Sequence, residues 1–429
     1  MVKLKSMDKH NIKYDIYSQI INSELIVALG CTEPIAIAFV AAKARQVLNA
    51  VPQSVVVEVC GNIIKNTKSV VVPNTDGLKG ISSAAAAGIL FGDADKKLEV
   101  LSAIKKENKG EIKNFIDEGK IKVIASESPK IFYINVYAKA GEREVSVTLE
   151  DNHTNITEIT LNGKTIFKPS NNQQLCEKDK LYSYLEVADI VNYADCVDLN
   201  NVSFALNRQI ELNMAISEEG LKNNWGAKIG KIISENNCDI NNKVIAAAAA
   251  GSDARMSGCC MPVVIVSGSG NQGITASVPV IRYSQYLNSD RETLLRALLI
   301  SNLMTIHQKT GIGKLSAFCG AVSAGVGAAC GIAYLNGGRY DAIAHTAVNA
   351  LAIASGIICD GAKPSCAGKI AASVFVGLLG YQMYLNGQEF LGGEGIITKG
   401  VDKTIANVGR LAKKGMKETD KEIIKIMAE

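Results

Sequence analysis

The stretch KIFYINVYAKAGEREVSVTLEDNHTNITEITLNGKTIF, residues 130–167, decides the fold of the first part of the chain. Its segments have the composition of β-strands, and KIKVIASE at 120–127 adds another strand just before it. Turn residues separate the segments, at Ala140-Gly141-Glu142 and at Asn162-Gly163. Because such short turns join neighbouring strands of opposite direction, the stretch predicts antiparallel hairpins.

Two helices are predicted at the start of the chain. Residues 11–29 show helical apolar spacing and stop at Gly30, a natural C-terminal glycine. The second helix is predicted over 31–48, with Thr32 as its cap and Pro34 in its first turn. Between these helices and the sheet we expect, in chain order, strands at 55–59 and 69–72, a PNTDG turn at 73–77, and helices at 81–91 and 98–118.

A polar stretch at 169–180, PSNNQQLCEKDK, predicts a surface connection and a domain boundary. Beyond it helical patterns dominate, interrupted by glycine-rich corners. We therefore predict an α+β fold in two parts. Residues 1–170 form an α+β part with antiparallel strands and helices, and residues 171–429 form a mostly helical, Gly/Ala-rich part.

Composition limits the classes of function. The 429 residues are 47% hydrophobic and 21% charged, which suits a globular protein and excludes collagen, low-complexity disorder and a disulfide miniprotein. The net charge is only +4, with basic and acidic residues interspersed, so a nucleic-acid partner is disfavoured. The 11 cysteines are an odd number, which favours a reducing compartment, and MVKLKSMDKHNIKY has no apolar signal region. We expect a cytoplasmic protein, compatible with a homo-oligomer.

One uncharged stretch, Leu315 to Leu335, has the length of a membrane span. It is rich in glycine and alanine and lacks flanking aromatic belts and a basic-loop bias. These features favour a buried helix of a soluble protein, and we expect no membrane partner.

Three cysteines lie at corners of the rear part: Cys319 in GKLSAFCGAV, Cys359 in SGIICDGAK and Cys366 in KPSCAGKI. A helix ending near Cys359, a Gly/Pro turn and a new helix capped by Ser365 would bring Cys359 and Cys366 to one corner. Free amides at a helix start favour a thiolate or an anionic group. The spacing alone also fits small packing residues, or a zinc site with His345 as a fourth ligand.

Cys31 lies between the two predicted N-terminal helices. A helix start lowers the pKa of a thiol, whereas the carboxylate of Glu33 raises it. The residue is thus either reactive or a small apolar group in a tight corner.

Polar residues near glycines are candidates for substrate contacts. SGSGNQG at 267–273 fits neither common phosphate-loop pattern, and a pocket for a small carboxylate with Asn271 as donor is the better functional interpretation. Asn74 is a second candidate for substrate binding. Either residue can equally be a turn former. His153 and Asn155 are expected in a hairpin loop, and His307 in a buried polar contact.

Four segments together resemble the L-cysteine desulfidase family, which is related to iron–sulfur-dependent bacterial L-serine dehydratases. They are ALGCTEPIAIAFVAAKAR at 28–45, GNIIKNTKSVVVPNTDGLKGI at 61–81, AAAAAGSDARMSGCCMPVVIVSGSGNQGI at 246–274 and GAKPSCAGKIAASV at 361–374. The resemblance covers most of the chain. It is specific for the family and less specific for the substrate.

The resemblance implies roles for the cysteines. Cys319, Cys359 and Cys366, separated by 40 and then 7 residues, match the ligands of a [4Fe-4S] cluster, and Cys31 matches the proposed catalytic base. The implied enzyme is a carbon–sulfur lyase that converts L-cysteine to pyruvate, ammonia and hydrogen sulfide, with the cluster as Lewis acid. L-Serine or L-threonine dehydration on the same scaffold, and a non-catalytic iron–sulfur sensor, stay open as alternatives.

Overall fold

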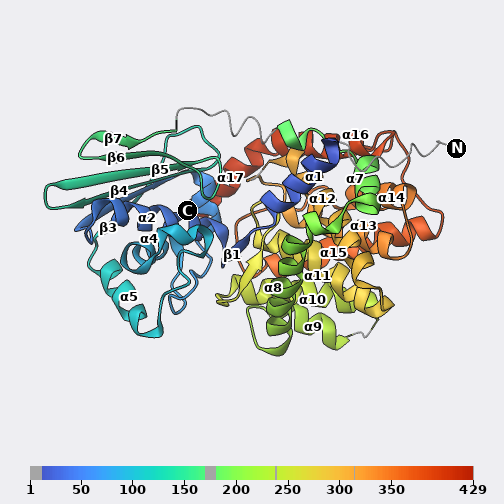
Figure 1. Ribbon diagram of the computed structural model, residues 1–429, viewed down its shortest axis with the longest axis horizontal. Helices are drawn as coiled ribbons and strands as arrows, with labels where there is room; N and C mark the ends of the chain where they lie inside the picture. Colours follow the sequence, from blue (N-terminus) through green and yellow to red (C-terminus); the bar gives the residue numbers. More distant parts are fainter. Residues whose placement is uncertain (1–11, 170–179, 237–238, 314, 429) are drawn as a thin grey trace.

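The computed structural model describes residues 12–169, 180–236, 239–313 and 315–428. Figure 1 shows two parts side by side, a sheet with helices against it and a larger body of helices. Strands and helices are mixed in the first part, and helices dominate the second. The predicted α+β fold class is therefore confirmed. The predicted connection at 169–180 falls almost entirely outside the described residues.

The six-stranded sheet contains the predicted hairpins. Its spatial order is β3 (Ile121–Ala125), β2 (Ser54–Val59), β4 (Tyr133–Ala140), β5 (Arg143–Glu150), β6 (Ile156–Leu161) and β7 (Lys164–Phe167). The β2–β3 pair is parallel and the other pairs are antiparallel. The helices of this part are α2 (Thr32–Leu48), α3 (Gly61–Thr67), α4 (Gly80–Phe91) and α5 (Lys109–Asp117). Helix α2 packs on β4 and β5, so one face of the sheet is covered.

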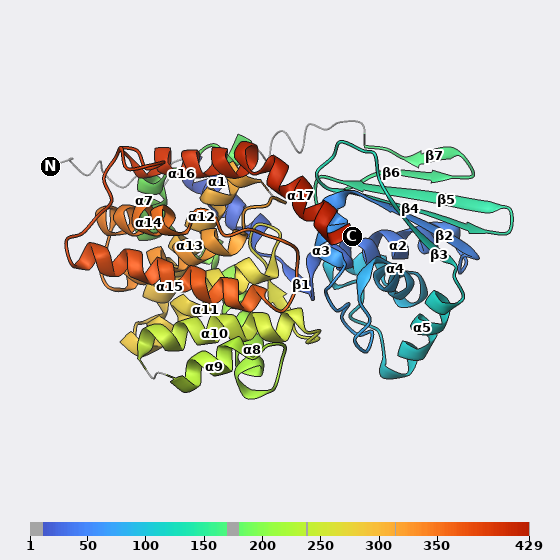
Figure 2. The ribbon, with the colours of Figure 1, turned by 180° about the vertical axis from the view of Figure 1, so that it is seen from behind.

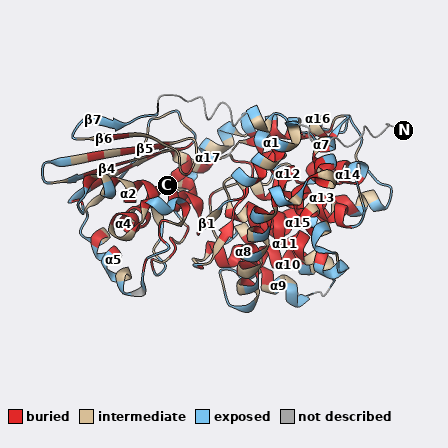
Figure 3. Ribbon diagram, in the orientation of Figure 1, coloured by how far each residue is buried: buried red, intermediate tan, exposed pale blue. Residues whose placement is uncertain are grey.

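The helical part is built from most of the remaining elements. These are α1 (Ile12–Glu24), α7 (Val187–Cys196), α8 (Ser203–Lys222), α9 (Ile229–Asn236), α10 (Ile240–Met256), α11 (Gly270–Leu287), α12 (Arg291–Ile312), α13 (Gly320–Leu335), α14 (Tyr340–Ala354), α15 (Cys366–Leu385) and α16 (Val401–Arg410). Figure 3 shows that the burial is greatest in the central helices of this body. Buried side chains of α1, which precedes the sheet in the chain, join this helical core. The division at residue 170 stays a prediction.

The predicted N-terminal helix is wrong over its last residues. Helix α1 ends at Glu24, and β1 (Val27–Leu29) pairs antiparallel with β8 (Pro262–Val264). Periodicity within one segment carries no information about a partner strand so distant in the chain, and that pairing decides the local structure here. Helix α2 begins as predicted, but Cys31 rather than Thr32 occupies the N-cap position.

Two further predictions before the sheet are corrected. Residues 69–72 form no strand and contribute a single bridge between Val71 and Lys79, after the unpredicted helix α3. Residues 98–118 are not one helix, because turns of 3₁₀ helix at Ala94–Glu99 and Lys106–Asn108 precede α5. The intervening apolar side chains Leu101 and Ile104 are buried in the core of this part, so packing overrides the helical pattern.

The uncharged stretch 315–335 contains α13, and every residue from Ala321 to Leu335 is buried. Among the described residues, one helix, α15, is long and apolar enough to cross a membrane, and half of its most apolar window is buried inside the fold. A single such helix is weak evidence for a membrane span, because a core helix has the same length and composition.

The last helix, α17 (Lys417–Ala428), joins the two parts. It leaves the helical body and lies against α3 beside the sheet, as Figure 2 shows from behind. Asp420 of α17 pairs with the buried ammonium of Lys65, and the Ile424 side chain fills the space over Gly61. This contact positions α3 next to the site described below.

A substitution at Gly220 tests the close packing of α8 on α10. A Cβ there would lie 1.9 Å from the Ala250 carbonyl oxygen, so Gly220→Ala forces the helices apart. We expect a loss of about 1–3 kcal/mol in the free energy of unfolding. Gly110→Ala, at an exposed position of α5 with nothing within 4 Å of its added Cβ, is the matched control and should be neutral or stabilising. Equal thermal midpoints for the two variants would contradict this packing.

Candidate active site

Backbone pairing brings Cys319 and Cys359 together. The Cys319 N–H donates to the Ile357 carbonyl at 2.9 Å, and the Cys359 N–H donates to the Ala317 carbonyl at 2.6 Å. These bonds join the segment before α13 to the segment after α14. The two thiols lie close enough for a hydrogen bond that raises the pKa of Cys319 and lowers that of Cys359.

Cys366 is the first residue of α15, as the sequence predicts. Its thiol donates to the Gly361 carbonyl at 3.7 Å, and both burial and the nearby Cys359 raise its pKa. Helix α14 ends at Ala354, earlier than the expected end near Cys359, and an extended segment carries Cys359 to the corner. All three cysteines therefore line one cavity of about 100 Å³, which we call the thiol cavity.

Cys31 lines the same thiol cavity from the opposite part of the fold. Its thiol donates to Glu33 Oε2 at 3.4 Å, and Glu33 also accepts from the Thr32 hydroxyl at 3.0 Å. Burial raises the pKa of the Cys31 thiol well above its ordinary value, the Glu33 carboxylate raises it further, and Arg255 lowers it. The resting group is thus a thiol whose proton points at a carboxylate.

Arg255, at the end of α10, is a site residue that sequence reasoning missed. It is 3% exposed, donates from its guanidinium to the Gly30 carbonyl at 2.8 Å and to Asn271 Oδ1 at 3.0 Å, and lines the thiol cavity. Its Nε is buried without a hydrogen-bond partner among the described residues. A Cβ on Gly270 would lie 2.4 Å from that Nε, so a side chain there would displace the guanidinium. A buried, incompletely satisfied arginine in a cavity suits a carboxylate ligand.

Two buried lysines flank the cysteines. Lys309 of α12 is 6% exposed and lines the thiol cavity. Burial lowers the pKa of Lys309 to about 8, and the negative charge of Cys359 and Cys319 acts in the opposite direction, raising that pKa. Lys65, paired with Asp420, helps to lower the pKa of Cys359. Buried ammonium groups are rare without an anion nearby. The site therefore provides positive charge next to three thiols.

The donor set fits an iron–sulfur cluster with three cysteine ligands. Thiolates are the usual cluster ligands, and the neighbouring lysines offset the negative charge that thiolates bring. No group of three or more His, Cys, Asp or Glu side chains within the described ranges is arranged to hold a single metal ion. The Cys319 and Cys359 thiols are within hydrogen-bonding distance of each other, so the fit rests on the ligand types and on the charge around them. His345, the alternative zinc ligand, instead contacts Glu389 and stacks on Tyr384, away from the cavity.

The other candidate residues are placed differently. Asn271 lines the thiol cavity, and its side-chain nitrogen has no partner among the described residues, which leaves it free to donate. Asn74 does not line the cavity: it donates to the Leu101 carbonyl at 2.9 Å, in the segment that follows the 3₁₀ turn at Ala94–Glu99. Asn155 donates to the Glu150 carbonyl in the hairpin, and His307 binds Asp402 at 2.8 Å.

Comparison with known proteins places the chain in a family. Residues 95–425 match the family described as serine dehydratase alpha chain. The chain belongs to this family. Its members are lyase-type dehydratases linked to iron–sulfur clusters, which agrees with the coarser part of the resemblance seen in the sequence.

Relatives are similar over nearly their whole length. A UPF0597 protein of Desulfitobacterium hafniense is 54% identical over 98% of both chains. UPF0597 proteins of Finegoldia magna and Treponema denticola are 48% and 43% identical, covering 96% and 98% of this chain and 99% of each relative. These names specify no substrate.

Proposed function

We propose that the protein catalyses the β-elimination of L-cysteine to pyruvate, ammonia and hydrogen sulfide at a [4Fe-4S] cluster held by Cys319, Cys359 and Cys366. The observation that carries the proposal is the shared thiol cavity, in which these cysteines face Cys31 and the buried guanidinium of Arg255. The membership of a lyase-type dehydratase family supports the reaction class.

The substrate carboxylate is bound by Arg255 and Asn271. The guanidinium has an unsatisfied Nε, and the amide nitrogen of Asn271 is free to donate within the described structure. When bound, a cluster with only three protein ligands supplies an open iron site and Lewis-acid assistance to a leaving group. The apolar side chains of Phe318 and Ile370 line the same cavity.

Cys31 is the proposed base. As a thiolate it removes the proton from Cα, the Cβ–S bond breaks, and HS⁻ leaves. The resulting aminoacrylate tautomerises and hydrolyses to pyruvate and ammonia. Glu33 accepts a hydrogen bond from the Cys31 thiol, so it orients the sulfur and is the nearest acceptor for its proton.

L-Serine is the second candidate substrate, because the matched family is described as serine dehydratase. The two substrates differ only in the β-heteroatom. Rates of pyruvate formation from L-cysteine and L-serine by the anaerobically purified protein, measured side by side as kcat/KM, decide between them. A larger kcat/KM for L-serine would overturn the choice of L-cysteine.

Replacing Arg255 tests the carboxylate contact. Arg255→Gln removes a charged hydrogen-bond donor worth about 1.5–3 kcal/mol, so kcat/KM should fall about 10- to 100-fold, mainly through KM. Arg410→Gln, at the exposed last position of α16, is the control and should leave kcat/KM unchanged. An unchanged KM in Arg255→Gln would remove Arg255 from substrate binding.

The pH profile tests the Cys31–Glu33 contact. The base is active as a thiolate, and Glu33 raises the Cys31 pKa, so activity should increase with pH in the native protein. Glu33→Gln removes the negative charge and should move the rising limb of kcat/KM to lower pH. Glu142→Gln, in the exposed β4–β5 turn, is the control and should leave the limb in place. If the rising limb of kcat/KM in Glu33→Gln moves to higher pH or does not move, the electrostatic coupling between Cys31 and Glu33 is contradicted.

A further inference from the structure

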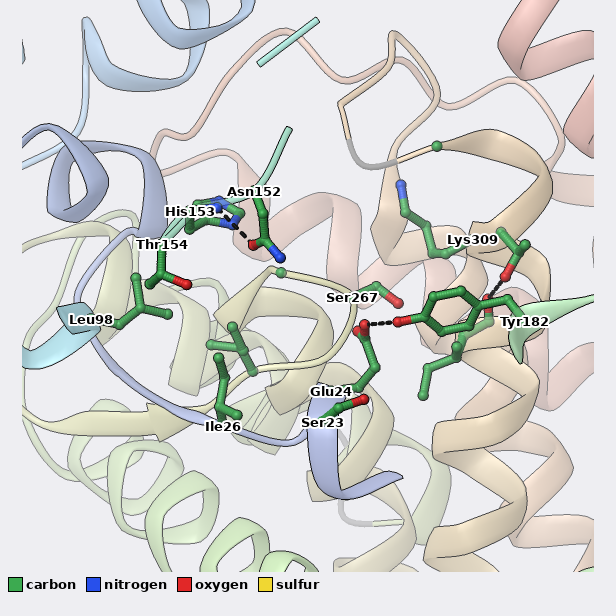
Figure 4. Close-up of a pocket in the computed structure, with 15 residues that line it drawn as sticks. Ser23, Glu24, Ile26, Leu98, Asn152, His153, Thr154, Tyr182, Ser267 and Lys309 are labelled. Carbon is green, nitrogen blue, oxygen red and sulfur yellow. Dashed lines mark hydrogen bonds between the residues drawn. The ribbon is translucent and has the colours of Figure 1, made fainter. Parts of the chain in front are cut away.

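A second cavity of about 230 Å³ lies between the two parts of the fold, and we call it the outer cavity. Its walls come from the end of α1, the loop after β5 and one side of α12, shown in Figure 4. Since a water molecule takes up ~30 Å³ of liquid volume, a small organic molecule and several waters fit inside. None of the proposed roles above uses this space.

Lys309 belongs to both cavities. In Figure 4 its nitrogen points away from α12 toward the side that carries Asn152 and His153. The residue is more than nine-tenths buried, and its ammonium has no hydrogen-bond or ion-pair partner among the described residues. The negative charge of Cys319 and Cys359 acts on this ammonium from the thiol cavity, and a carboxylate in the outer cavity can pair with it from the other side.

Glu24 provides the opposite charge. It lies at the end of α1, is half-buried, and accepts a hydrogen bond from the Tyr182 hydroxyl. The same cavity contains neutral polar groups, among them Ser23, Ser267 and Thr310. One carboxylate and one ammonium with neutral groups around them complement a molecule that carries both charges.

A short glycine-rich segment separates the two cavities. Ser267 and Gly268 line the outer cavity, whereas Ser269 lines the thiol cavity. Ser267 and Gly268 both have positive φ, of 48° and 77°, and the Gly268 carbonyl accepts from the Thr32 hydroxyl at 3.0 Å. A Cβ at Gly268 would lie 2.9 Å from the His153 ring, so the segment needs glycine to pass there. The wall between the cavities is therefore one thin loop next to Lys309.

We propose that the outer cavity is a binding site for a small zwitterionic α-amino acid, whose ammonium contacts Glu24 and whose carboxylate contacts Lys309, on its way to the thiol cavity. This role deepens the proposed function and rests on it for the identity of the amino acid. Because Lys309 faces both cavities, it can hold the carboxylate first in one and then release it to Arg255 in the other.

Binding without turnover tests the site independently of the reaction. L-Alanine carries both charges and has no β-leaving group, propionate lacks the ammonium, and both are titrated calorimetrically into the full-length protein purified anaerobically. We expect Glu24→Gln to weaken L-alanine binding at least fivefold and Glu24→Asp to restore part of it. Propionate binding should be unchanged or tighter in Glu24→Gln, because a repelling carboxylate is lost. Glu142→Gln is the control and should match the native protein.

Kinetics separate this proposal from the proposed function. With L-cysteine or L-serine, Glu24→Gln should raise KM at least fivefold and leave kcat within about twofold, with the same cluster absorbance as the native protein. If the native protein turns over substrate and Glu24→Gln changes neither KM nor the affinity for L-alanine, the outer site is overturned. The proposed function then stands. Absence of any turnover, together with Glu24-dependent L-alanine binding, would overturn the proposed function and support the outer site.

Discussion

Cys31→Ser is expected to lower kcat for L-cysteine by at least about a thousandfold while the protein keeps its iron and its visible absorbance. General-base catalysis contributes roughly 10²–10⁴-fold, and a serine hydroxyl does not ionise in the pH range in which a thiol can. The substitution changes one atom at the N-cap of α2, where Cys31 packs with Val70 and Met256 and is not one of the three rear cysteines. Iron content and the rate of pyruvate formation, measured on the same anaerobic preparation, check both halves of the expectation.

Cys60 offers a matched control for this substitution. Like Cys31, it is buried at the N-cap position of a helix, here α3. Its thiol donates to a main-chain oxygen, the Ile131 carbonyl at 3.1 Å. Unlike Cys31, it does not line the thiol cavity. Cys60→Ser should therefore retain kcat within about threefold. If Cys31→Ser instead loses the iron, Cys31 is a ligand rather than the base.

Cys359→Ser is expected to abolish iron binding and activity together. Cys359 is the cysteine whose pKa is lowered by its hydrogen bond with Cys319 and by Lys65, so it is the most readily ionised of the three. A serine oxygen is a poor ligand for iron in a cluster, and the neighbouring lysines would then lose an anionic partner. Iron and acid-labile sulfide per chain, determined after anaerobic reconstitution, measure the effect.

The control for cluster loss is Cys330→Ser in α13. Cys330 is fully buried near the Ile343 carbonyl and lies outside the cavity, so this variant tests the general cost of replacing a buried thiol by a hydroxyl. It should be less stable and still bind iron. Equal iron content in Cys359→Ser and the native protein would exclude Cys359 as a ligand.

The sequence was most informative where structure is local. The hairpins of the sheet follow from turn residues such as Asn162-Gly163, and the start of α15 at Cys366 follows from the preceding Gly/Pro turn. The strand Val27–Leu29 could not be predicted in this way, because its partner lies near Val264. Its geometry depends on tertiary contacts that a local pattern does not encode.

The same distinction applies to the site. The three rear cysteines and Cys31 were singled out by their contexts and by the family resemblance, and the fold brings them to one cavity. Arg255 and Lys309 were missed, because a basic residue inside a helical pattern usually marks a solvated face. Their burial depends on how the helices pack, which no local pattern shows. The sequence marked this region only through the glycine-rich stretch that includes Gly270, whose backbone lies next to the Arg255 side chain.

The dependence of turnover on bound iron tests the central claim most directly. Anaerobic preparations of the protein are loaded to different extents, iron and acid-labile sulfide are determined, and the rate of pyruvate formation from L-cysteine is measured on each. The account predicts a maximum of about four irons and four sulfides per chain, and a rate that rises in proportion to them from zero. Full turnover in iron-free protein, or none from either L-cysteine or L-serine in fully loaded protein, would contradict it.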